Sequence, residues 1–600
     1  MKIRNRYMFL VDALIFVVSA FFSSFIVYRT VDERIVIAAP AVIVSTLIML
    51  FFFHFYNIKI EKSSIEIVTR SVKAFAPVTI LSSIISTVVK GEALGAYCFV
   101  LETYALAIML SYRFLVRYYF KKQGLLATRD NPLAIVYGAG EVGTALAREQ
   151  FKGRLPYNII GYVDDSPKLH NMDVLGFHVM GTVDELAFLL KANNIKCLII
   201  AITNLSQDKM YKAVDAAKDN GCEVKIIPSL FEIQQGAKEI DLRNLDYPDL
   251  LGRPLIQIDK TPVEAMVKNK VVLVTGACGS IGSEISKQLI DFGVKQLIMI
   301  DIDESGLHDI GLRLSGYKTE ISERIVPILC DIKNRNKIDR IYAQFKPEIV
   351  YHAAAYKHVP MGEREPDEII KTNVIGSYNV LSSAKKAGVK RVVIISTDKA
   401  VNPTNVMGAS KRMVELVASM LTSKETEIVA VRFGNVLGSR GSMLPLFIEQ
   451  IHAGVPITVT HKDIIRYFMA IPEAVSLVLK AGAMAQSGEV MVLDMGQPVR
   501  IYDFAQKLVK YYGDGRSQVV VTGLRPGEKL YEELLADEDL TIPTDDKLVF
   551  KAKLNDHKLD VNEFNEFKEN IESYTEVELV EKLNEFVPEF DCQHSKIVLG

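Results

Sequence analysis

The chain lacks several features that would place it in other classes of protein. Its six cysteines form no CxxC pair and no group with histidines. This scatter is typical of reduced thiols in a cytosolic body and argues against a disulfide framework or a zinc site. The formal net charge is only −2, so the overall charge gives no indication of nucleic-acid binding. Tryptophan is absent, which excludes no class by itself.

Long apolar runs are present, and they are concentrated at the N-terminus: Tyr7–Val27, Ile35–Phe55, Ala74–Val89 and Ala93–Leu115. A membrane-spanning helix needs roughly 20 apolar residues, and the third run is the shortest of the four. Acidic residues lie inside the first and fourth runs, where polar groups are costly and usually face neighbouring helices. The sequence therefore predicts a four-helix transmembrane anchor in residues 1–122. The alternative is a set of buried helices in a soluble domain.

Basic residues predict the orientation of this anchor, because cytoplasmic loops carry an excess of lysine and arginine. They precede the first run, lie between the second and third runs, and follow the fourth: Lys2, Arg4, Arg6, Lys59, Lys62, Arg70, Lys73, Arg113, Arg117, Lys121 and Lys122. The other two loops are short and nearly balanced in charge. Both termini and the whole soluble part are expected on the cytoplasmic side.

A glycine-rich turn follows the anchor. An apolar strand leads into a GxGxxG turn made by Gly138, Gly140 and Gly143, and the next strand ends at Asp164 and Asp165. A carboxylate at that spacing is where a ribose hydroxyl would bind. Residues 130–250 are therefore expected to form a small Rossmann-like sheet. No catalytic group follows the turn before residue 250, so a bound dinucleotide and a docking or regulatory role both stay open.

A second turn of this type, GxxGxxG, follows the strand at 270–275. Glycines let the backbone approach a pyrophosphate, and the N-terminus of the following helix supplies positive potential. The residues expected to bind a dinucleotide here are Gly276, Gly279, Ser280, Ile281 and Gly282.

The next strand ends complete this predicted cofactor site. Asp301 ends the second strand, where it would bind the adenosine ribose and repel a 2′-phosphate, so NAD is favoured over NADP. Asp331 and Ile332 end the third strand and would contact the adenine. Ala353 and Ala354 end the fourth strand, where small side chains would let the cofactor lie flat.

The candidate catalytic residues follow the fifth strand as Ser396-Thr397-Asp398-Lys399, with Met407 and Lys411 further on. In a short-chain dehydrogenase a tyrosine would stand at the position of Met407. A thioether has no proton to give or take, so the usual proton acceptor for alcohol oxidation is missing.

Several longer motifs extend this pattern: LGRP at 251–254, TGACGSIGSE at 275–284, HAAAYKHVPMGE at 352–363, STDKAVNPTNVMGASKR at 396–412, RFGNVLGSRGS at 432–442, DIIRYFM at 463–469 and GLRPGEKLYEELL at 523–535. With the anchor and the preceding Rossmann-like unit, they make the chain similar to the CapD-like polysaccharide biosynthesis family. That family consists of membrane-anchored UDP-N-acetylglucosamine 4,6-dehydratases of bacterial capsule, O-antigen and protein-glycosylation pathways. The resemblance covers nearly the whole chain.

The resemblance implies an α/β fold with four transmembrane helices and two doubly wound sheets. The second sheet would be an extended short-chain dehydrogenase domain, residues 262–600, with a small substrate lobe. It also implies a location in the bacterial inner membrane, contact with its lipid, and self-association. The charged segment from about 545 to 600, with helical spacing at Val561–Phe586, is expected to cover the substrate lobe.

The implied reaction is an internal redox dehydration of UDP-N-acetylglucosamine. Thr397 would bind the C4 oxygen, Asp398 would protonate the departing C6 hydroxyl, and Lys399 would be the base at C5, which requires that its pKa be lowered. Lys411 would hold the nicotinamide ribose and, directly or through a water, accept the C4 proton. Met407 is expected to pack without a catalytic role.

The substrate contacts expected from the motifs are Lys357, Asn435, Arg440, Ser442, Arg525 and Glu528. Arginine suits a pyrophosphate because it offers two parallel donors. His352 and His358 have no carboxylate or cysteine that would complete a metal site, so no metal is expected. Two other functions stay open: a UDP-sugar 4-epimerase, and a membrane sensor that binds a sugar nucleotide without turnover.

Overall fold

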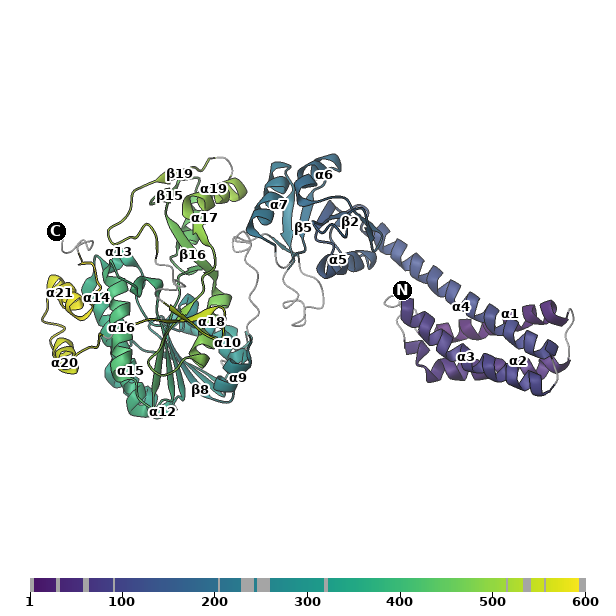
Figure 1. The fold of residues 1–600 in the computed structure, drawn as a ribbon, viewed down its shortest axis with the longest axis horizontal. Coiled ribbons are helices and arrows are strands. Elements are labelled where there is room, and N and C mark those ends of the chain that lie inside the picture. The colour runs from purple at the N-terminus through teal and green to yellow at the C-terminus, as the bar shows by residue number, and fades with distance from the viewer. Residues whose placement is uncertain are drawn as a thin grey trace. The chain divides into compact units, whose positions relative to one another are not determined.

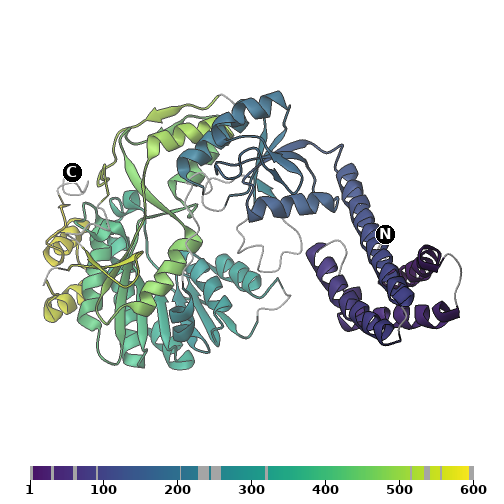
Figure 2. The same cartoon turned by 45° about the vertical axis from the view of Figure 1, so that its right-hand side comes forward.

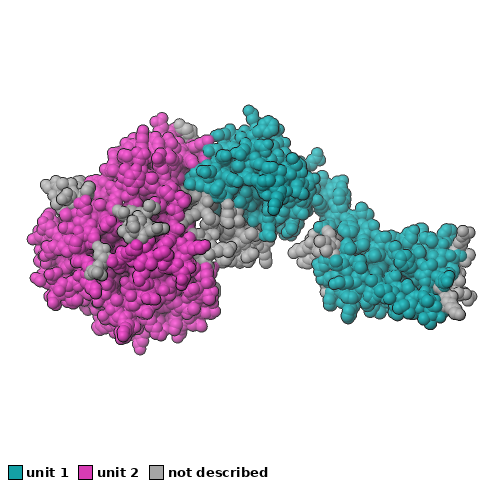
Figure 3. All heavy atoms as spheres, viewed as in Figure 1, with its two compact units in different colours: residues 1–254 teal, residues 255–600 magenta. Residues whose placement is uncertain are grey.

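The structure is a computed structural model that describes residues 5–28, 33–57, 64–89, 92–202, 205–227, 242–244, 259–317, 322–513, 516–532, 541–554 and 557–592. The chain divides into two compact units, residues 1–254 and 255–600 (Figure 3). The motif at 251–254 and the part of the GLRPGEKLYEELL segment beyond Glu532 lie outside the described residues.

Four long helices begin the first unit: α1 (Asn5–Tyr28), α2 (Glu33–Phe52), α3 (Ser64–Val88) and α4 (Glu92–Ala127). They pack side by side (Figure 1), and each is long and apolar enough to cross a membrane. The carboxylate of Asp12 is buried in the bundle and pairs with Arg113, Oδ2 to Nη2 at 2.6 Å. Glu102 is buried beside Thr79. Both acids face neighbouring helices, as the sequence predicted, and the chain is a membrane-anchored protein.

Two of these helices extend beyond the apolar runs that predicted them. α3 begins at Ser64 because its first turns, which carry polar residues, do not read as an apolar run. α4 continues to Ala127 and passes the expected boundary at residue 122. Its last turns pack against α5 (Glu141–Phe151), with Lys121 Nζ 4.3 Å from the ring centroid of Phe151.

The first unit also contains a seven-stranded sheet of order β3-β4-β2-β1-β5-β6-β7. β1, β2, β5 and β6 are parallel, as expected for a Rossmann-like unit. The strands are β1 (Leu133–Tyr137), β2 (Asn158–Val163), β3 (Asp173–Val174), β4 (Phe177–Val179), β5 (Cys197–Ile200), β6 (Glu223–Ile226) and β7 (Arg243–Asn244). Among its described residues, α6 (Leu186–Ala192) and α7 (Gln207–Asp219) are further α-helices.

The second unit is built on a nine-stranded sheet of order β10-β9-β8-β11-β12-β13-β17-β21-β20. The strands from β10 to β17 run parallel, and β21 and β20 add an antiparallel edge. The strands are β8 (Val271–Thr275), β9 (Gln296–Asp301), β10 (Ile325–Leu329), β11 (Ile349–His352), β12 (Arg391–Ile395), β13 (Glu427–Arg432), β17 (Val490–Leu493), β20 (Thr541–Pro543) and β21 (Val549–Ala552).

Helices cover both faces of this sheet (Figure 2). Its central strands β8, β11, β12, β13 and β17 are mostly apolar and mostly buried, as strands covered on both faces are. One layer contains α9 (Thr261–Val267), α10 (Ser280–Asp291) and α18 (Ile471–Met484), and α18 contacts both of the others. The other contains α12 (Arg335–Phe345), α15 (Ser377–Ala387) and α16 (Val406–Leu421). α11 (Glu304–Leu314) packs on β9 and β10.

A small lobe is inserted around the carboxyl ends of the strands, as the resemblance implied. It contains a three-stranded sheet, β14 (Asn435–Leu437), β16 (Ile465–Ala470) and β18 (Pro498–Arg500), and a two-stranded sheet, β15 (Ile457–Val459) and β19 (Val519–Val521). α17 (Met443–His452) and α19 (Ile501–Tyr512) pack on each other within it.

The expectation that the C-terminal segment covers this lobe is wrong. α20 (Val561–Glu569) and α21 (Glu576–Phe586) instead lie against the layer of α14 (Pro366–Ile370), α15 and α16 (Figure 1). The reason is a set of buried rings: Phe564, Phe567 and Phe586 contact one another, and Phe564 lies 5.3 Å from Tyr378 of α15. An apolar helical face settles where the largest apolar surface can be buried.

Candidate active site

The predicted cofactor and catalytic residues meet at one edge of the second sheet. β10, β9, β8, β11 and β12 are adjacent and parallel, so their carboxyl ends lie together. Ligands of open α/β sheets bind at this edge. The glycine turn follows β8, Asp301 ends β9, Asp331 follows β10, Ala353 follows β11 and Thr397 follows β12.

The turn between β8 and α10 has the shape of a phosphate cradle. Gly276 has φ +66°, and a Cβ there would lie 2.6 Å from the backbone nitrogen of Ala354. A Cβ on Gly282 would lie 2.1 Å from the oxygen of Gly276, whereas Gly279 meets only that oxygen, at 3.2 Å. Glycine is thus required where the turn packs on β11, and Gly279 leaves the N-terminus of α10 approachable for an anion. Ser280 and Ile281 form the first turn of that helix.

Asp301 is placed both to shape this turn and to bind a ligand. Its Oδ2 accepts from the backbone nitrogen of Cys278 at 2.8 Å, and its Oδ1 accepts from those of Ile302 and Asp303. The carboxylate is half-buried, and two carboxylate oxygens offer about four acceptor positions. The carboxylate thus stands at the end of β9, where a ribose hydroxyl would bind.

Asp331 and Ile332 flank the far side of the cofactor edge. Asp331 Oδ1 accepts from the nitrogen of Lys333 at 2.8 Å, so part of its role is to form the turn after β10. Ile332 is buried and packs against Gly376, where a Cβ would lie 2.7 Å away. His352, at the end of β11, is buried between the hydroxyls of Thr275 and Ser377, and burial lowers its pKa to about 3. A neutral imidazole in that position ties β8, β11 and α15 together.

Thr397, Asp398 and Lys399 form a compact cluster directly after β12. Asp398 is buried, and its Oδ1 accepts three hydrogen bonds: from Thr397 Oγ1 at 2.8 Å, from Lys399 backbone N at 2.9 Å and from Lys399 Nζ at 3.0 Å. An oxygen that accepts three donors has no proton of its own to donate. The acid and the base proposed from the sequence are therefore in direct contact.

The expectation of a lowered pKa for Lys399 is wrong. Burial acts to lower this pKa, but the carboxylates of Asp398 and Glu532 outweigh it, and the pKa of Lys399 is raised above its usual value. Glu532 Oε1 lies 3.3 Å from Lys399 Nζ. It also lies 3.4 Å from Nε of Arg466.

Met407 and Lys411 lie in the first turns of α16, and both are buried. Lys411 Nζ donates to the backbone oxygen of Ile395 at the end of β12, 2.5 Å away. Burial lowers the pKa of Lys411 to about 8, with Glu415 acting in the opposite direction. Of the two lysines expected to act as bases, Lys399 and Lys411, it is therefore Lys411 that loses its proton more readily near neutral pH.

A buried ionic network supports the catalytic helix one turn beyond Lys411. Glu415 accepts from Ser396 Oγ at 2.7 Å, from Nε and Nη2 of Arg432 at 2.8 and 2.6 Å, and from Nη1 of Arg412 at 3.2 Å. Arg412 also pairs with Glu589, which follows α21. The C-terminal segment is therefore connected to the residue that precedes Thr397.

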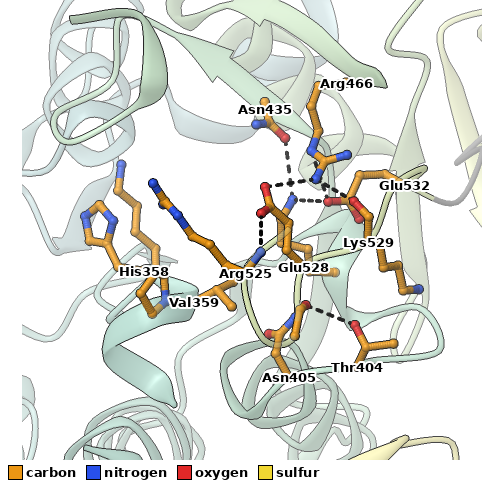
Figure 4. A pocket seen from close by; sticks show the side chains of 14 residues that line it. His358, Val359, Thr404, Asn405, Asn435, Arg466, Arg525, Glu528, Lys529 and Glu532 are labelled. Atoms are coloured by element: carbon orange, nitrogen blue, oxygen red, sulfur yellow. Dashed lines mark hydrogen bonds and ion pairs between the residues drawn. The ribbon is translucent and has the colours of Figure 1, made fainter. Parts of the chain in front are cut away.

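A pocket opens beside the cluster (Figure 4). It is lined by Lys357, His358, Val359, Pro360, Lys399, Thr404, Asn405, Asn435, Arg466, Arg525, Gly527, Glu528, Lys529 and Glu532. Five lysines and arginines face two carboxylates, so the pocket favours an anionic ligand such as a diphosphate. Burial lowers the pKa of Lys357, whose Nζ donates to the oxygen of Arg440.

The loop that carries Arg525 and Glu528 is fixed to the start of α16. The side chains of Thr404 and Asn405 donate to the oxygen of Gly527 at 3.2 and 3.1 Å. Asn405 also caps α16 by accepting from the nitrogen of Gly408 at 2.8 Å. One residue thus orients both the catalytic helix and the predicted substrate loop.

Four of the six predicted substrate residues line this pocket, namely Lys357, Asn435, Arg525 and Glu528, and two lie elsewhere. Arg440 is exposed beside the glycine turn, where its backbone nitrogen donates to Ser280 Oγ at 3.0 Å and its Nη1 lies 3.7 Å from Asp303. Ser442 begins α17, and its hydroxyl is buried without a recorded partner. Arg440 therefore connects the two sites through its backbone, because its oxygen accepts from the pocket residue Lys357, while its side chain lies beside Asp303.

Sequence reasoning missed three charged residues of this site: Glu532, Arg466 and Glu415. The first two lie inside the motifs GLRPGEKLYEELL and DIIRYFM, which were the available signal. Glu415 lies one helical turn after Lys411, so its position on the same face of α16 was readable. Within the part of the chain that the structure describes, no group of three or more histidine, cysteine or acidic side chains could hold a metal ion.

The turn of the first unit repeats one feature of the second. Asp164 Oδ2 accepts from the backbone nitrogen of Ala139 at 2.8 Å, as Asp301 does from Cys278. Asp165 differs, because it is held by Tyr137, by the nitrogen of Val183 and by Lys209. The shared fold explains the first contact without a ligand.

Comparisons with known proteins agree with this architecture. Residues 272–554 match the polysaccharide biosynthesis protein family, and residues 34–228 match a CoA-binding domain family. The chain is 37% identical over 559 residues to the capsular polysaccharide biosynthesis protein CapD of Staphylococcus aureus, covering 90% of this chain and 92% of that protein. It is 36% identical over 283 residues to the UDP-glucose 4-epimerase of Rickettsia canadensis, covering 46% and 80%.

Among solved structures, Pen from Bacillus thuringiensis matches with 30% identity and a TM-score of 0.44, covering 49% of this chain and 90% of that one. The near full-length similarity to CapD decides the family. This chain belongs to the CapD-like polysaccharide biosynthesis proteins, and its second unit is an enzyme domain of the short-chain dehydrogenase superfamily.

Proposed function

We propose that the protein catalyses the NAD-dependent 4,6-dehydration of UDP-N-acetylglucosamine to UDP-2-acetamido-2,6-dideoxy-4-hexulose. The observation that carries the proposal is the contact between Asp398 and Lys399 at the carboxyl end of β12. An acid and an amine thus lie side by side, and Lys399 lines the cationic pocket. An elimination needs an acid and a base that act on neighbouring carbons of one sugar.

The residues of the cofactor edge fit a nicotinamide dinucleotide. Three features suit such a group: the cradle at Gly276 and Gly279, the approachable start of α10, and the carboxylate of Asp301. When bound, it would take a hydride from C4 of the sugar and return it to C6 as C5 regains a proton. The negative charge of Asp301 would repel a 2′-phosphate, which favours NAD over NADP.

Oxidation at C4 requires that the C4 hydroxyl lose its proton. Thr397 would hold the C4 oxygen by a hydrogen bond. Lys411 would accept the proton, directly or through a water, because its pKa of about 8 leaves a useful fraction of neutral amine. Met407 cannot take this role because a thioether does not exchange protons.

The elimination follows from the 4-ketone, which acidifies the proton on C5. Lys399 would remove that proton, and its bonding electrons would form the C5–C6 double bond as the C6 hydroxyl departs. Asp398 would protonate that hydroxyl, which leaves as water. Lys357, Asn435, Arg525 and Glu528 would hold the sugar nucleotide in the pocket.

A UDP-sugar 4-epimerase is the second candidate, because a relative of 36% identity carries that name. Such an enzyme also oxidises C4, but it needs no acid and amine pair beside the sugar. The cluster of Asp398 and Lys399 favours the dehydratase. We also propose that the protein lies in the bacterial inner membrane in contact with its lipid, with the catalytic unit in the cytoplasm, and that it self-associates.

The test is to incubate the purified full-length protein with UDP-N-acetylglucosamine and follow the sugar by NMR in deuterated water. The expected product lacks the C6 hydroxyl, carries a 4-ketone, and acquires deuterium at C5. Inversion at C4 with the C6 hydroxyl retained would establish the epimerase. Binding of the sugar nucleotide and NAD without any new sugar would establish a sensor.

A further inference from the structure

The proton of Lys399 is the unsolved part of the proposed chemistry. A base at C5 must be a neutral amine, yet Nζ of Lys399 lies 3.0 Å from Oδ1 of Asp398 and 3.3 Å from Oε1 of Glu532. Two carboxylates on two sides of one amine stabilise its charged form. Asp398 in turn accepts three donors on Oδ1, so that oxygen has no proton to give until one is transferred to it.

Glu532 is held in place and cannot swing away from this amine. Its side chain is only 4% exposed, and Oε1 also faces Nε of Arg466 at 3.4 Å. Arg466 is fixed by three backbone oxygens: Nη1 donates to Ile465 and Leu530, and Nη2 donates to Lys529 at 2.8 Å. The arginine therefore anchors the carboxylate of Glu532, which lies beside it in Figure 4, and that carboxylate pairs with Lys399.

The other charged groups around the amine come from several elements. Asn435 of β14 accepts from Nζ of Lys399 at 3.4 Å. Glu528 pairs with Arg466, its Oε1 lying 3.7 Å from Nη2 of the arginine, and the same oxygen accepts a hydrogen bond from Thr460. The remaining titratable or charged residues that line the pocket are Lys357, His358, Arg525 and Lys529.

We propose that Glu532 is a positioning residue that stores a proton on Lys399 in the resting enzyme, and that dehydration begins when this proton passes from Nζ of Lys399 to Oδ1 of Asp398. The inference rests on the proposed dehydration. It adds a residue outside the Thr397–Lys399 cluster, and a definite order of proton movements.

A single transfer makes both groups competent. The N–H bond of the Lys399 ammonium breaks and an O–H bond forms on Asp398, so the pair becomes amine and carboxylic acid with no change in total charge. Elimination then moves the C5 proton to the amine and the Asp398 proton to the departing hydroxyl, which leaves as water. The pair ends the elimination as ammonium and carboxylate. When the hydride returns to C6, C5 takes a proton from the ammonium, and the proton that Lys411 took from the C4 hydroxyl restores the ammonium through solvent. Arg466 balances the charge of Glu532, so the transfer is not blocked.

The test measures the protonation of Lys399 directly in the full-length protein. The rate of its acetylation by acetic anhydride, read by peptide mass spectrometry, reports the fraction of neutral amine at each pH. In Glu532→Gln the midpoint is expected to fall by about one to three pH units, because an opposite charge within hydrogen-bonding distance is lost. Equal midpoints in the variant and the wild type would overturn the proposal.

Matched variants separate charge from structure. Glu528→Gln removes a carboxylate from the same pocket that pairs with Arg466, whereas Lys399 pairs with Asp398 and Glu532, so the Lys399 midpoint should stay near that of the wild type. Glu532→Asp keeps the charge on a shorter chain and should give a smaller shift in the same direction as Glu532→Gln. If Glu532→Gln does not fold, an unshifted midpoint in Glu532→Asp counts against the proposal.

Turnover supplies an independent readout. The alkaline limb of kcat, where the pair loses its only proton, should move to lower pH in Glu532→Gln by the same amount as the acetylation midpoint. A merely structural role would lower kcat equally at every pH, and that result would overturn the proposal. If the wild type produces no keto sugar, the proposed function fails and the proton order fails with it, whereas the acetylation experiment still decides whether Glu532 controls Lys399.

Discussion

Replacing Glu415 with glutamine is expected to destabilise the second unit strongly. The Glu415 carboxylate is buried and accepts two hydrogen bonds from Arg432 at 2.8 and 2.6 Å, one from Ser396 at 2.7 Å and one from Arg412 at 3.2 Å. Glutamine offers one acceptor oxygen and no charge, so Arg432 stays buried without the carboxylate that pairs with it. Breaking a buried ion pair in this way costs about 3–5 kcal/mol of unfolding free energy.

The loss converts into a measurable change in melting temperature. Unfolding entropy is about 2.1 cal/mol/K per residue, which over residues 255–600 amounts to about 0.7 kcal/mol/K. The melting temperature of the second unit should therefore fall by about 4–7 °C. Thermal unfolding of the detergent-solubilised protein at neutral pH, followed by the fluorescence of a thiol-reactive dye on the buried cysteines, measures it.

The pH dependence provides a second check with a definite sign. Burial acts to raise the pKa of Glu415, but the neighbouring arginines outweigh it, so the pKa of Glu415 is lowered. The stabilisation is then complete above the usual glutamate pKa of about 4.3 and is lost as the pH falls through the lower folded value. The exposed Glu425 on the same unit is the control. Equal melting temperatures for Glu415→Gln, Glu425→Gln and the wild type at neutral pH would refute this reasoning.

Three further predictions concern the site itself. Asp398→Asn should leave NAD binding intact and lower the formation of keto sugar by about two orders of magnitude or more; undiminished turnover removes Asp398 from its role. Gly276→Ala should abolish NAD binding, measured by calorimetry, because the new Cβ would lie 2.6 Å from the backbone of Ala354. Gly388→Ala is the control: Gly388 also has a positive φ, 71°, but a Cβ there would meet open space, so this variant should lose stability and keep NAD binding. The acid limb of kcat/KM should have an apparent pKa near 8, set by Lys411, and Lys411→Arg should lower activity and remove that limb; an unchanged limb assigns the proton to another group.

Local patterns carried most of the cofactor edge. The turn at Gly276, the acid at Asp301 and the small residues at Ala353 are set by contacts between adjacent strands, so a strand followed by the right residue is enough to place them. The anchor was predicted for the same reason, since the length of an apolar run decides whether a helix can cross a bilayer. Only the polar starts and ends of α3 and α4 were missed.

The protonation of Lys399 and the position of α20 and α21 could not be predicted in this way. The pKa of Lys399 depends on Glu532, which comes from a distant part of the chain and meets the amine only after the small lobe has folded. The helical spacing at Val561–Phe586 predicted helices correctly, but no property of an apolar face says which of several surfaces it covers. The pKa of Lys399 and the position of α20 and α21 both depend on tertiary contacts, which the local spacing of residues does not reveal.

The seating of α20 and α21 on α16 has a consequence for how the protein is made. Helix α16, which carries Lys411, is synthesised well before α20 and α21, which cover its layer. During this interval Arg412 cannot pair with Glu589, because Glu589 has not yet been synthesised. The nascent chain on the ribosome therefore exposes an apolar surface beside the incomplete candidate active site. A premature stop codon shortly before Val561 would leave a polypeptide that has the glycine turn but whose helix α16 is uncovered, a target for quality-control proteases.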